Sequence, residues 1–356
     1  MTHDDRIRNE PSPGSRPVPR RLLAFDVGGA NLKAADGCGD VHCEPFELWR
    51  RPGDLAARLT AIAAPRRPER IVATMTGEIA DCYPDRRSGV AAIVAALSRA
   101  ADAVNADLGI YRLDGLVVPA EEAVRAPLSV AASNWHALAR LAATHAARDR
   151  ALLVDVGSTT TDVVFLDRHG PVPIALDDAG RLASGELVYT GVERTPVAAL
   201  VRSLPMGTGR RRVATELFAR AQDVWMLLGG IPEGPGSHDT ADGGPATRAA
   251  ARVRLARMML LEPATIGEAD AVVAARHVAA VQARLVARAV RSVLRAHPRP
   301  PERVVVTGHG GALAAAALDV VVPRLPRVHL DAILGAAAAR AAPAVALALL
   351  AKGEIG

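Results

Sequence analysis

Two short polar segments of this sequence share one order of an aspartate, a glycine turn and further polar side chains. Residues 26 to 33 are DVGGANLK and residues 155 to 162 are DVGSTTTD, and an apolar run beginning Leu-Leu precedes each. The apolar runs predict buried strands that end at glycine turns. Backbone N–H groups and hydroxyls of such turns suit phosphate oxygens, and the aspartate suits Mg²⁺, held directly or through water.

The first segment carries a lysine in a chain that otherwise uses arginine almost throughout. Lys33 is accompanied by one other lysine, Lys352. A compact ammonium group with three donors suits phosphate charge, so Lys33 is a candidate for phosphate binding and for catalysis. Gly28 and Gly29 would let the backbone approach a phosphate closely, and Asn31 adds a polar side chain. The alternative is an ordinary hairpin turn with a solvated lysine.

The second segment supplies hydroxyl groups between two carboxylates. Asp155 and Asp162 are candidate metal ligands beside Asp26 of the first segment, and Asp155 is also a candidate catalytic residue. The predicted phosphate-binding residues of this turn are Gly157, Ser158, Thr159 and Thr160. The alternative is a hydroxyl-rich turn that satisfies its own backbone groups.

A third glycine segment lies late in the chain, where residues 304 to 311 are VVVTGHGG. A strand that ends in glycines before a helix leaves backbone N–H groups at the helix N-terminus, where an anion binds well. Gly308, Gly310 and Gly311 are therefore candidate phosphate-binding residues. Such a cluster is also common in ordinary turns, so the order of the three segments is the stronger signal.

A strand predicted at 71 to 75 runs into Thr76, Gly77 and Glu78. We predict Thr76 as a substrate-binding residue. Glu78 is a candidate catalytic base. The alternative, of equal weight, is a glutamate that caps a helix or lies on the surface.

Other candidates lie outside the glycine turns. Arg194 could bind a substrate carboxylate or phosphate with both arms of its guanidinium group or form a structural ion pair. Thr195, which follows it, and Asn134 are further predicted substrate-binding residues. Trp135, beside Asn134, could stack on an aromatic substrate, although a single tryptophan at a helix start is more often a core residue. Asp242 is a candidate metal ligand or the first residue of an Asx turn.

The elements that would position these residues divide the chain into two similar halves. Residues 1 to 20 are polar and proline-rich and predict a disordered tail. The first half, 21 to 150, has predicted strands at 22–25, 32–35, 41–49, 71–75, 110–113 and 115–118 and helices at 54–64, 89–107 and 134–148. The recurrence of the strand–turn–strand unit predicts two domains facing each other across a cleft.

The second half, 151 to 356, repeats the strand–turn–strand unit and adds a helical insertion at about 195 to 300. Its predicted strands are 151–155, 162–167, 304–306, 319–322 and 327–329. Its predicted helices are 195–204, 213–228, 247–261 and 268–297, one after residue 311, and a last one from 331. The Gly- and Pro-rich stretch 229 to 245 predicts a long loop.

Composition excludes several function classes. The 356 residues are 50% hydrophobic and carry a net charge of +5. The arginines are spread along helical stretches beside acidic residues, which is typical of solvated helix faces and argues against nucleic-acid binding. The N-terminus has no apolar signal core, and Arg340 and Pro343 interrupt the most apolar stretch, 331 to 351. We expect a cytoplasmic protein that does not bind membranes and acts on small molecules.

The order of the Asp-Gly turn, second Asp-Gly turn and late glycine turn resembles the actin-like ATPase superfamily, also called ASKHA. That family includes sugar kinases, Hsp70 and hydantoinase/oxoprolinase-type proteins. The resemblance implies an α/β fold of two ribonuclease-H-like domains around a central cleft. It also implies that residues 26–33, 155–162 and 307–311 surround a nucleotide or a diphosphate.

A narrower resemblance covers most of the chain from residue 21. It rests on DVGGANLKAA, MTGEIADCY, SNWHALA, DVGSTTTD, YTGVERTPV and DTADGGPATR. These motifs resemble a hydantoinase/oxoprolinase-related family of tetrahydromethanopterin-linked C1-transfer pathway proteins. The resemblance implies a transferase of methanofuran-type cofactor biosynthesis that joins a furan methyl diphosphate to a phenol and uses Mg²⁺. The charge that develops on the diphosphate would be stabilised by Lys33 and by Mg²⁺ near Asp26 and Asp155.

Two other functions remain open at this point. An ATP-dependent kinase or hydrolase of the same fold would use the late glycine turn for adenosine. A non-catalytic nucleotide-binding regulator would lack turnover altogether. The sequence does not decide between a monomer and a homo-oligomer.

Overall fold

The structure is a computed structural model that describes residues 21–146 and 150–353. The tail predicted at 1–20 lies outside the described residues, as do the last residues of the helix predicted at 134–148. The first of two large sheets has the strand order β3-β2-β1-β4-β5-β6. Its strands are β1 Leu22–Val27, β2 Asn31–Ala35, β3 Val41–Pro45, β4 Arg70–Met75, β5 Asp107–Tyr111 and β6 Val117–Val118.

The second sheet repeats this plan with the order β10-β8-β7-β13-β14, and β9 pairs with β8. Its strands are β7 Ala151–Val156, β8 Thr161–Asp167, β9 Gly170–Pro171, β10 Leu187–Val188, β13 Arg303–Thr307 and β14 Arg327–His329. In each sheet the first strand pairs antiparallel with the second and parallel with a later one. Two sheets of this ribonuclease-H-like pattern are the architecture of the actin-like ATPases, so the predicted fold class is confirmed.

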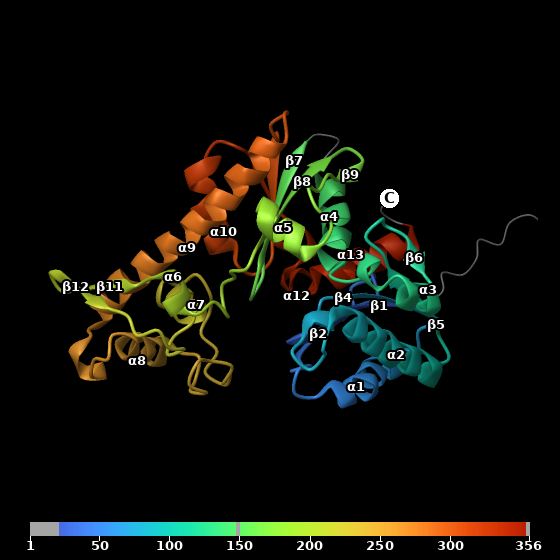
Figure 1. The fold of residues 1–356 in the computed structure, drawn as a ribbon, viewed down its shortest axis with the longest axis horizontal. Coiled ribbons are helices and arrows are strands. Elements are labelled where there is room, and N and C mark those ends of the chain that lie inside the picture. Colours follow the sequence, from blue (N-terminus) through green and yellow to red (C-terminus); the bar gives the residue numbers. More distant parts are fainter. Residues whose placement is uncertain (1–20, 147–149, 354–356) are drawn as a thin grey trace, which may run out of the picture.

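Helices cover both faces of the first sheet (Figure 1). The outer helices α1 Leu55–Ala63 and α2 Arg86–Val104 pack on one face. Leu23 and Phe25 of β1 belong to that core, whereas Leu22 and Ala24 point to the opposite face. Because successive strand residues alternate between faces, an uninterrupted apolar run such as 22–25 requires cover on both sides.

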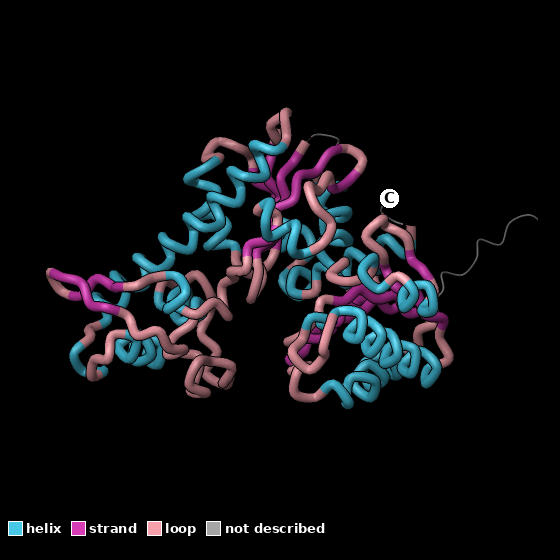
Figure 2. The backbone as a smooth tube through the Cα atoms, in the orientation of Figure 1, coloured by secondary structure: helices cyan, strands magenta, loops and turns pink. Residues whose placement is uncertain are grey.

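Two helices lie between the sheets and join the halves (Figures 1 and 2). They are α4 Asn134–His145 and α13 Ala342–Lys352. Leu141 of α4 is buried against the first sheet, and Leu138 of the same helix is buried against the second. Apolar residues of α13 also pack on the first sheet, so the C-terminal helix completes the core of the N-terminal half.

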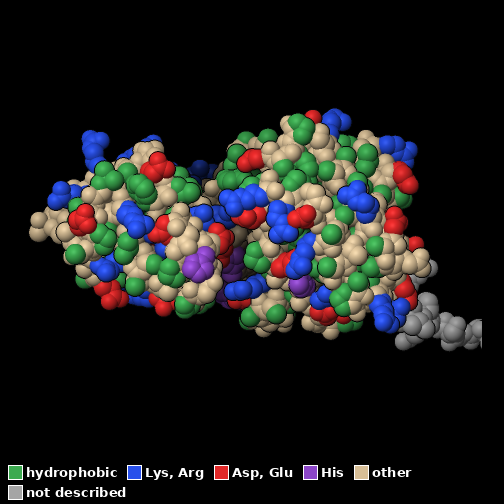
Figure 3. All heavy atoms as spheres, turned by 90° about the horizontal axis from the view of Figure 1, so that it is seen from below, with side chains coloured by type: hydrophobic (Ala, Val, Ile, Leu, Met, Phe, Trp, Pro, Cys, Tyr) green, Lys and Arg blue, Asp and Glu red, His purple; other side chains and the backbone are tan. Residues whose placement is uncertain are grey.

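A separate lobe extends from the second sheet on the left of Figure 1 and is carried by the long helix α9. Its elements are α6 Val197–Leu200, β11 Ser203–Met206, β12 Gly209–Arg212, α7 Ala221–Leu227, α8 Arg248–Met258 and α9 Glu268–Ala296. From below, the surface is hollowed between this lobe and the rest of the molecule, and basic and acidic side chains are intermixed around the hollow (Figure 3). Among the described residues, none of the helices is both long and apolar enough to cross a membrane.

The predicted helices at 195–204 and 213–228 were wrong over much of their length. Residues 203–212 form a β-hairpin around a tight turn at Gly207, whose φ is +55°. Of 213–228, only 221–227 is helical. The apolar spacing there fits a helix, but β11 and α7 pack against α9, and Ala214 N donates to Met258 O of α8. Such tertiary contacts override a weak local preference.

Three other predicted elements were also corrected. The third strand ends at Pro45, so Trp49 lies beyond it. Residues 319–321, predicted as a strand, continue the helix α10 Gly311–Val321. The single last helix is divided into α11 Leu330–Leu334, α12 Ala336–Arg340 and α13, because Gly335 adopts a φ of +84° and Pro343 lacks the N–H that a continuous helix requires.

Leu141 tests the role of α4 between the sheets. We expect Leu141→Ala to lower the free energy of unfolding by about 2–5 kcal/mol, because it leaves a cavity in a fully packed core. Leu128→Ala, at a position where the side chain is 54% exposed, is the control and should change it by less than about 0.5 kcal/mol. Urea denaturation measures both, and equal effects would contradict the packing described for α4.

Candidate functional site

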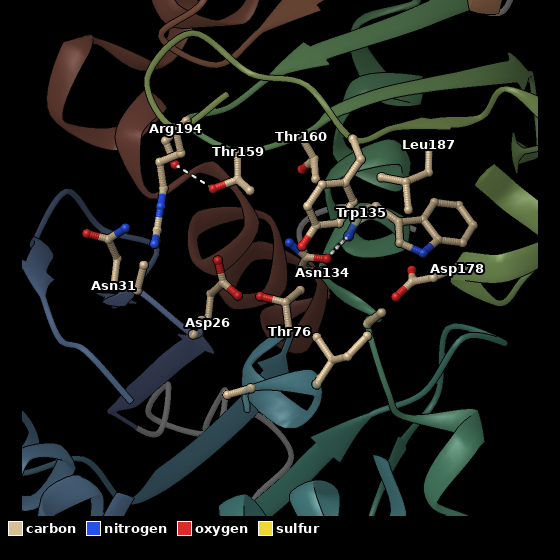
Figure 4. Close-up of a pocket in the computed structure, with 18 of the residues that line it drawn as sticks. Asp26, Asn31, Thr76, Asn134, Trp135, Thr159, Thr160, Asp178, Leu187 and Arg194 are labelled. Carbon is tan, nitrogen blue, oxygen red and sulfur yellow. Dashed lines mark hydrogen bonds between the residues drawn. The ribbon is translucent and has the colours of Figure 1, made fainter. Parts of the chain in front are cut away.

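The two Asp-Gly hairpins face one cleft of about 640 Å³ between the halves. In Figure 4, Asp26 and Asn31 of the first hairpin lie across the cleft from Thr159 and Thr160 of the second. The predicted site residues that line the cleft are Asp26, Gly28, Gly29, Asn31, Lys33, Thr76, Asn134, Trp135, Ser158, Thr159, Thr160, Asp162 and Arg194. Two segments that a whole domain separates in the sequence therefore share one cavity.

Both hairpins have the same backbone geometry. Gly28 N donates to Asn31 O at 3.0 Å in the first, and Gly157 N donates to Thr160 O at 2.9 Å in the second. A Cβ on Gly28 would come within 2.9 Å of Asn31 O. The tight turns therefore place their polar residues at the ends of the two central strands.

The segment after β10 supports the second turn from behind. Ser158 O accepts hydrogen bonds from the N–H groups of Glu193 (3.1 Å) and Arg194 (2.9 Å). The backbones touch so closely that a Cβ on Gly191 would lie 2.5 Å from Gly157 O. These bonds occupy carbonyl oxygens of the turn, while its hydroxyl side chains line the cleft.

Lys33 is the cation of the first hairpin and lies opposite Asp26 in the β1–β2 register. Its Nζ donates to Asp26 Oδ2 at 3.3 Å. Burial lowers the pKa of Lys33, but the charge of Asp26, then that of the Cys43 thiolate and, from the other half, that of Asp155 outweigh burial and raise its pKa overall. The ammonium group therefore remains charged between the two halves.

The second hairpin has two carboxylates at the corresponding positions, because Asp155 lies opposite Asp162. Burial, and then the charge of Asp162, raises the pKa of Asp155 to about 7. Burial also raises the pKa of Asp162, although Arg181 Nη2 donates to its Oδ1 at 2.8 Å. Asp162 thus has a fixed cationic partner, whereas Asp155 has no ion pair with a described residue.

A magnesium ion fits part of the predicted ligand set. Asp26 Oδ1 is buried without a hydrogen-bond partner, and a cation would relieve both this oxygen and the crowded charge of Asp155. Within the described ranges no three His, Cys, Asp or Glu side chains are grouped as ligands. Mg²⁺ commonly keeps several waters and takes further oxygens from phosphates, so two carboxylates suffice.

Asp242 lies outside the cleft lining, in the added lobe. Its two oxygens accept from Arg254 at 3.1 Å and Arg257 at 2.7 Å, and Gly244 N also donates to it. Arg254 in turn pairs with the buried Asp223 at 2.7 Å. The structure therefore places Asp242 in an ion-pair network that holds α7 and α8 together.

The late glycine turn approaches the cleft from behind β7 and does not line it. Gly308 has a φ of +82°, and a Cβ there would lie 2.3 Å from Val156 O and 2.5 Å from Asp155 Oδ1. A Cβ on Gly310 would lie 2.2 Å from a Val156 methyl group. Gly308 and Gly310 thus let the backbone pack on the strand that carries Asp155, whereas a Cβ on Gly311, at the start of α10, would meet no atom within 4 Å.

Two further predicted residues are turned into the protein interior. Thr195 Oγ1 bonds the hydroxyl of Thr190 and the N–H of Gly191, each at 3.0 Å, and so braces the segment behind the second turn. Glu78 is fully buried, outside the cleft lining, with no hydrogen-bond partner for either carboxylate oxygen. Burial raises the pKa of Glu78 to about 7.

Several lining residues were missed by sequence reasoning. They are Ala30, Trp49, Ile79, Ala80, Asp81, Ala132, Asp178, Arg181, Leu187 and Tyr189. Trp49 and Tyr189 carried a usable signal, because aromatic residues make up only 3% of the chain. Ala30 lies within DVGGANLK, and Ile79, Ala80 and Asp81 lie within MTGEIADCY, but their positions in these motifs did not reveal that they line the cavity.

Two contacts join the halves across the cleft. The guanidinium group of Arg194 lies 5.2 Å from the ring centroid of Trp49. In addition, Arg86 at the start of α2 pairs with Asp178 at the start of the helix α5 Asp178–Ser184. Both pairs involve lining residues, so the contacts that hold the halves together also bound the cavity.

The chain belongs to the hydantoinase/oxoprolinase family, whose pattern matches residues 69–351. Among curated proteins, it is 29% identical over 301 residues to a (4-{4-[2-(gamma-L-glutamylamino)ethyl]phenoxymethyl}furan-2-yl)methanamine synthase of Methanocaldococcus jannaschii. That alignment covers 84% of this chain and 88% of the relative. A synthase of the same name from Methanococcus vannielii is 34% identical over 108 residues, covering 30% of this chain and 48% of the relative.

Because its curated relatives are synthases, the chain is an enzyme that acts on small molecules. Among solved structures, nucleotide-free acetone carboxylase superposes with a TM-score of 0.50 at 10% identity, over 94% of this chain and 70% of that one. At this identity the likeness concerns the fold alone.

The ionisation of Glu78 has a measurable effect on stability. The pKa of Glu78 in the folded protein, about 7, lies above its ordinary value of 4.5. The protonated carboxyl therefore contributes fully to the free energy of unfolding below pH 4.5, and this contribution is lost as the pH rises through 7. We expect the free energy of unfolding of the wild type, relative to Glu78→Gln, to fall by roughly 3 kcal/mol over this range. Urea titrations at a series of pH values measure it.

Glu121→Gln, at an exposed position in α3 Ala120–Arg125, is the control and reports the loss of a solvated carboxylate. A difference between wild type and Glu78→Gln that stays constant with pH would show that burial does not perturb the Glu78 carboxyl.

Proposed function

We propose that this enzyme joins an aminomethylfuran methyl diphosphate to the phenol of a γ-glutamyltyramine- or tyrosine-type acceptor and releases diphosphate. It would thereby serve methanofuran- or methylofuran-type cofactor biosynthesis, which is linked to one-carbon transfer on tetrahydromethanopterin. The observation that carries the proposal is the similarity over 84% of the chain to a synthase whose name describes a furan methanamine joined through a phenoxymethyl ether.

The character of the cleft supports this reaction. One part is polar, where the two turns, Lys33 and Arg194 offer donors and positive charge to a diphosphate. Another part is apolar, where Ile79, Leu187 and Tyr189 line the cavity. A substrate that combines a diphosphate with an aromatic ring meets both surfaces at once.

The residues of the polar part match the charge that develops during the reaction. Breaking the bond between the furan methylene carbon and the diphosphate oxygen leaves positive character on carbon and negative charge on the leaving group. Lys33, half-buried and positioned by Asp26, would stabilise that negative charge. Because Asp26 already orients the ammonium group, little reorganisation is required as the charge appears.

Mg²⁺ is the metal that we propose for this cleft, with Asp26 and Asp155 as its protein ligands. When bound, it would neutralise diphosphate charge and help the group to leave. Asp162 then serves as an orienting partner of Arg181 rather than as a ligand, since Arg181 already occupies one of its oxygens.

The decisive assay combines purified protein, the furan diphosphate, a γ-glutamyltyramine-type phenol and Mg²⁺, and measures diphosphate and the aryl ether. We expect Lys33→Met to lower kcat by about a hundredfold or more, because it removes a donor to the leaving group. Lys352→Met, which removes the other lysine at a position outside the cleft lining, is the matched control and should keep wild-type turnover.

Absence of diphosphate release with tyramine-type and tyrosine-type phenols would overturn the proposed function. Tight Mg-ATP binding with release of phosphate would instead identify an ATP-dependent kinase or hydrolase of this fold.

A further inference from the structure

Asp178 lies at the apolar end of the cleft, beside Trp135 and away from Arg194 and Asn31 (Figure 4). Its Oδ2 accepts a hydrogen bond from Arg86 Nη2, and no described residue donates to its Oδ1. The side chain is 24% exposed and belongs to the cleft lining. One oxygen of an oriented carboxylate is therefore open to a ligand.

The other carboxylates around the cleft pair with cations, lie in the protein interior or have no partner that orients them. Asp26 is bonded to Lys33, and Asp162 is bonded to Arg181. Glu78 is enclosed in the protein interior behind the cleft wall. Asp81 also lines the cleft, but no described residue orients it. At the apolar end of the cleft, Asp178 thus combines a fixed orientation with a free acceptor oxygen, whereas the free Oδ1 of Asp26 is buried beside Lys33.

The surface next to Asp178 suits an aromatic ring. Two large side chains line the cavity here, Ile79 from the first half and Tyr189 from the second. They are 56% and 67% exposed, respectively, so both can contact a ligand. Leu187 and Trp135 complete this wall. The guanidinium carbon of Arg181 lies 3.9 Å from the ring centroid of Trp135. The guanidinium group thus covers one face of the indole and fixes the orientation of the ring.

We propose that Asp178 is the catalytic base that accepts the phenol proton of the acceptor substrate, whose ring is held by Ile79, Leu187 and Tyr189. This inference rests on the proposed function. The phenol O–H would donate to Asp178 Oδ1. As the phenol oxygen bonds to the furan methylene carbon, the proton passes to Asp178 and the carbon–oxygen bond to diphosphate breaks, its electron pair leaving with the diphosphate. Asp178 then releases the proton to solvent.

Arg86 acts in this arrangement as a positioning residue. It comes from α2 of the first half, whereas Asp178 begins α5 of the second, so the pair forms when the halves are together. The base is consequently held at the seam between the halves, on the same wall as the aromatic surface. The charged groups that interact with Asp178 are Arg86, Glu78 and Asp162.

A series of acceptor phenols of increasing acidity tests the role of Asp178. With weakly acidic phenols, Asp178→Asn should lower kcat by about a hundredfold or more, which is the usual contribution of a general base. With phenols that are already ionised at the assay pH, the variant should approach the wild-type rate, because no proton remains to be accepted. Asp319→Asn, at an exposed aspartate that pairs with Arg327 outside the cleft lining, is the matched control and should follow the wild type across the series.

A second variant distinguishes loss of the catalytic base from loss of structure. Asp178→Ala should recover activity toward weakly acidic phenols when formate is added as an external proton acceptor. An equal loss with all phenols, without rescue by formate, would overturn the inference and assign Asp178 to holding the halves together. No release of diphosphate by the wild type with any phenol would instead overturn the proposed function, so the two failures are distinct.

Discussion

Buried negative charge at the ends of the two central strands is the constraint on which this structure depends. Asp26 is the penultimate residue of β1 and Asp155 the penultimate residue of β7, and each lies at the same register position of its hairpin. A buried carboxylate is costly unless a cation compensates it. Lys33 contacts one aspartate directly and acts electrostatically on the other across the cleft, so the charge balance holds only when the halves face each other.

The means of holding the halves together follow from this requirement. Helices α4 and α13 share apolar contacts with the sheets on either side, and two polar contacts, Arg86–Asp178 and Arg194–Trp49, bound the cleft. Unpartnered buried polar atoms occur near this seam, on Glu78, Trp135 and Arg181. Native proteins retain few such atoms, and here they surround the surface assigned to the acceptor ring.

Much of the architecture was accessible from the sequence because it depends on local pattern. The apolar runs before Asp26 and Asp155 predicted strands covered on both faces, and the repeated Asp-Gly turn predicted two similar halves. The helix ranges between 195 and 228 were wrong, since residues of the added lobe take their conformation from contacts with α9. Glu78 illustrates the same limit for the site, because its place after a strand does not reveal on which side of the wall its carboxyl lies.

The sequence by itself determined the two hairpins, the residues at their turns and the place of Lys33 on the first hairpin, since glycine spacing and strand alternation act over a few residues. Only the tertiary structure decided that Asp162 is held by Arg181 and that Asp242 belongs to a distant ion-pair network. It also decided that Asp178 lines the cleft beside Trp135. Those outcomes depend on which distant segments pack together, and the energy of that packing comes from the whole core rather than from any local motif.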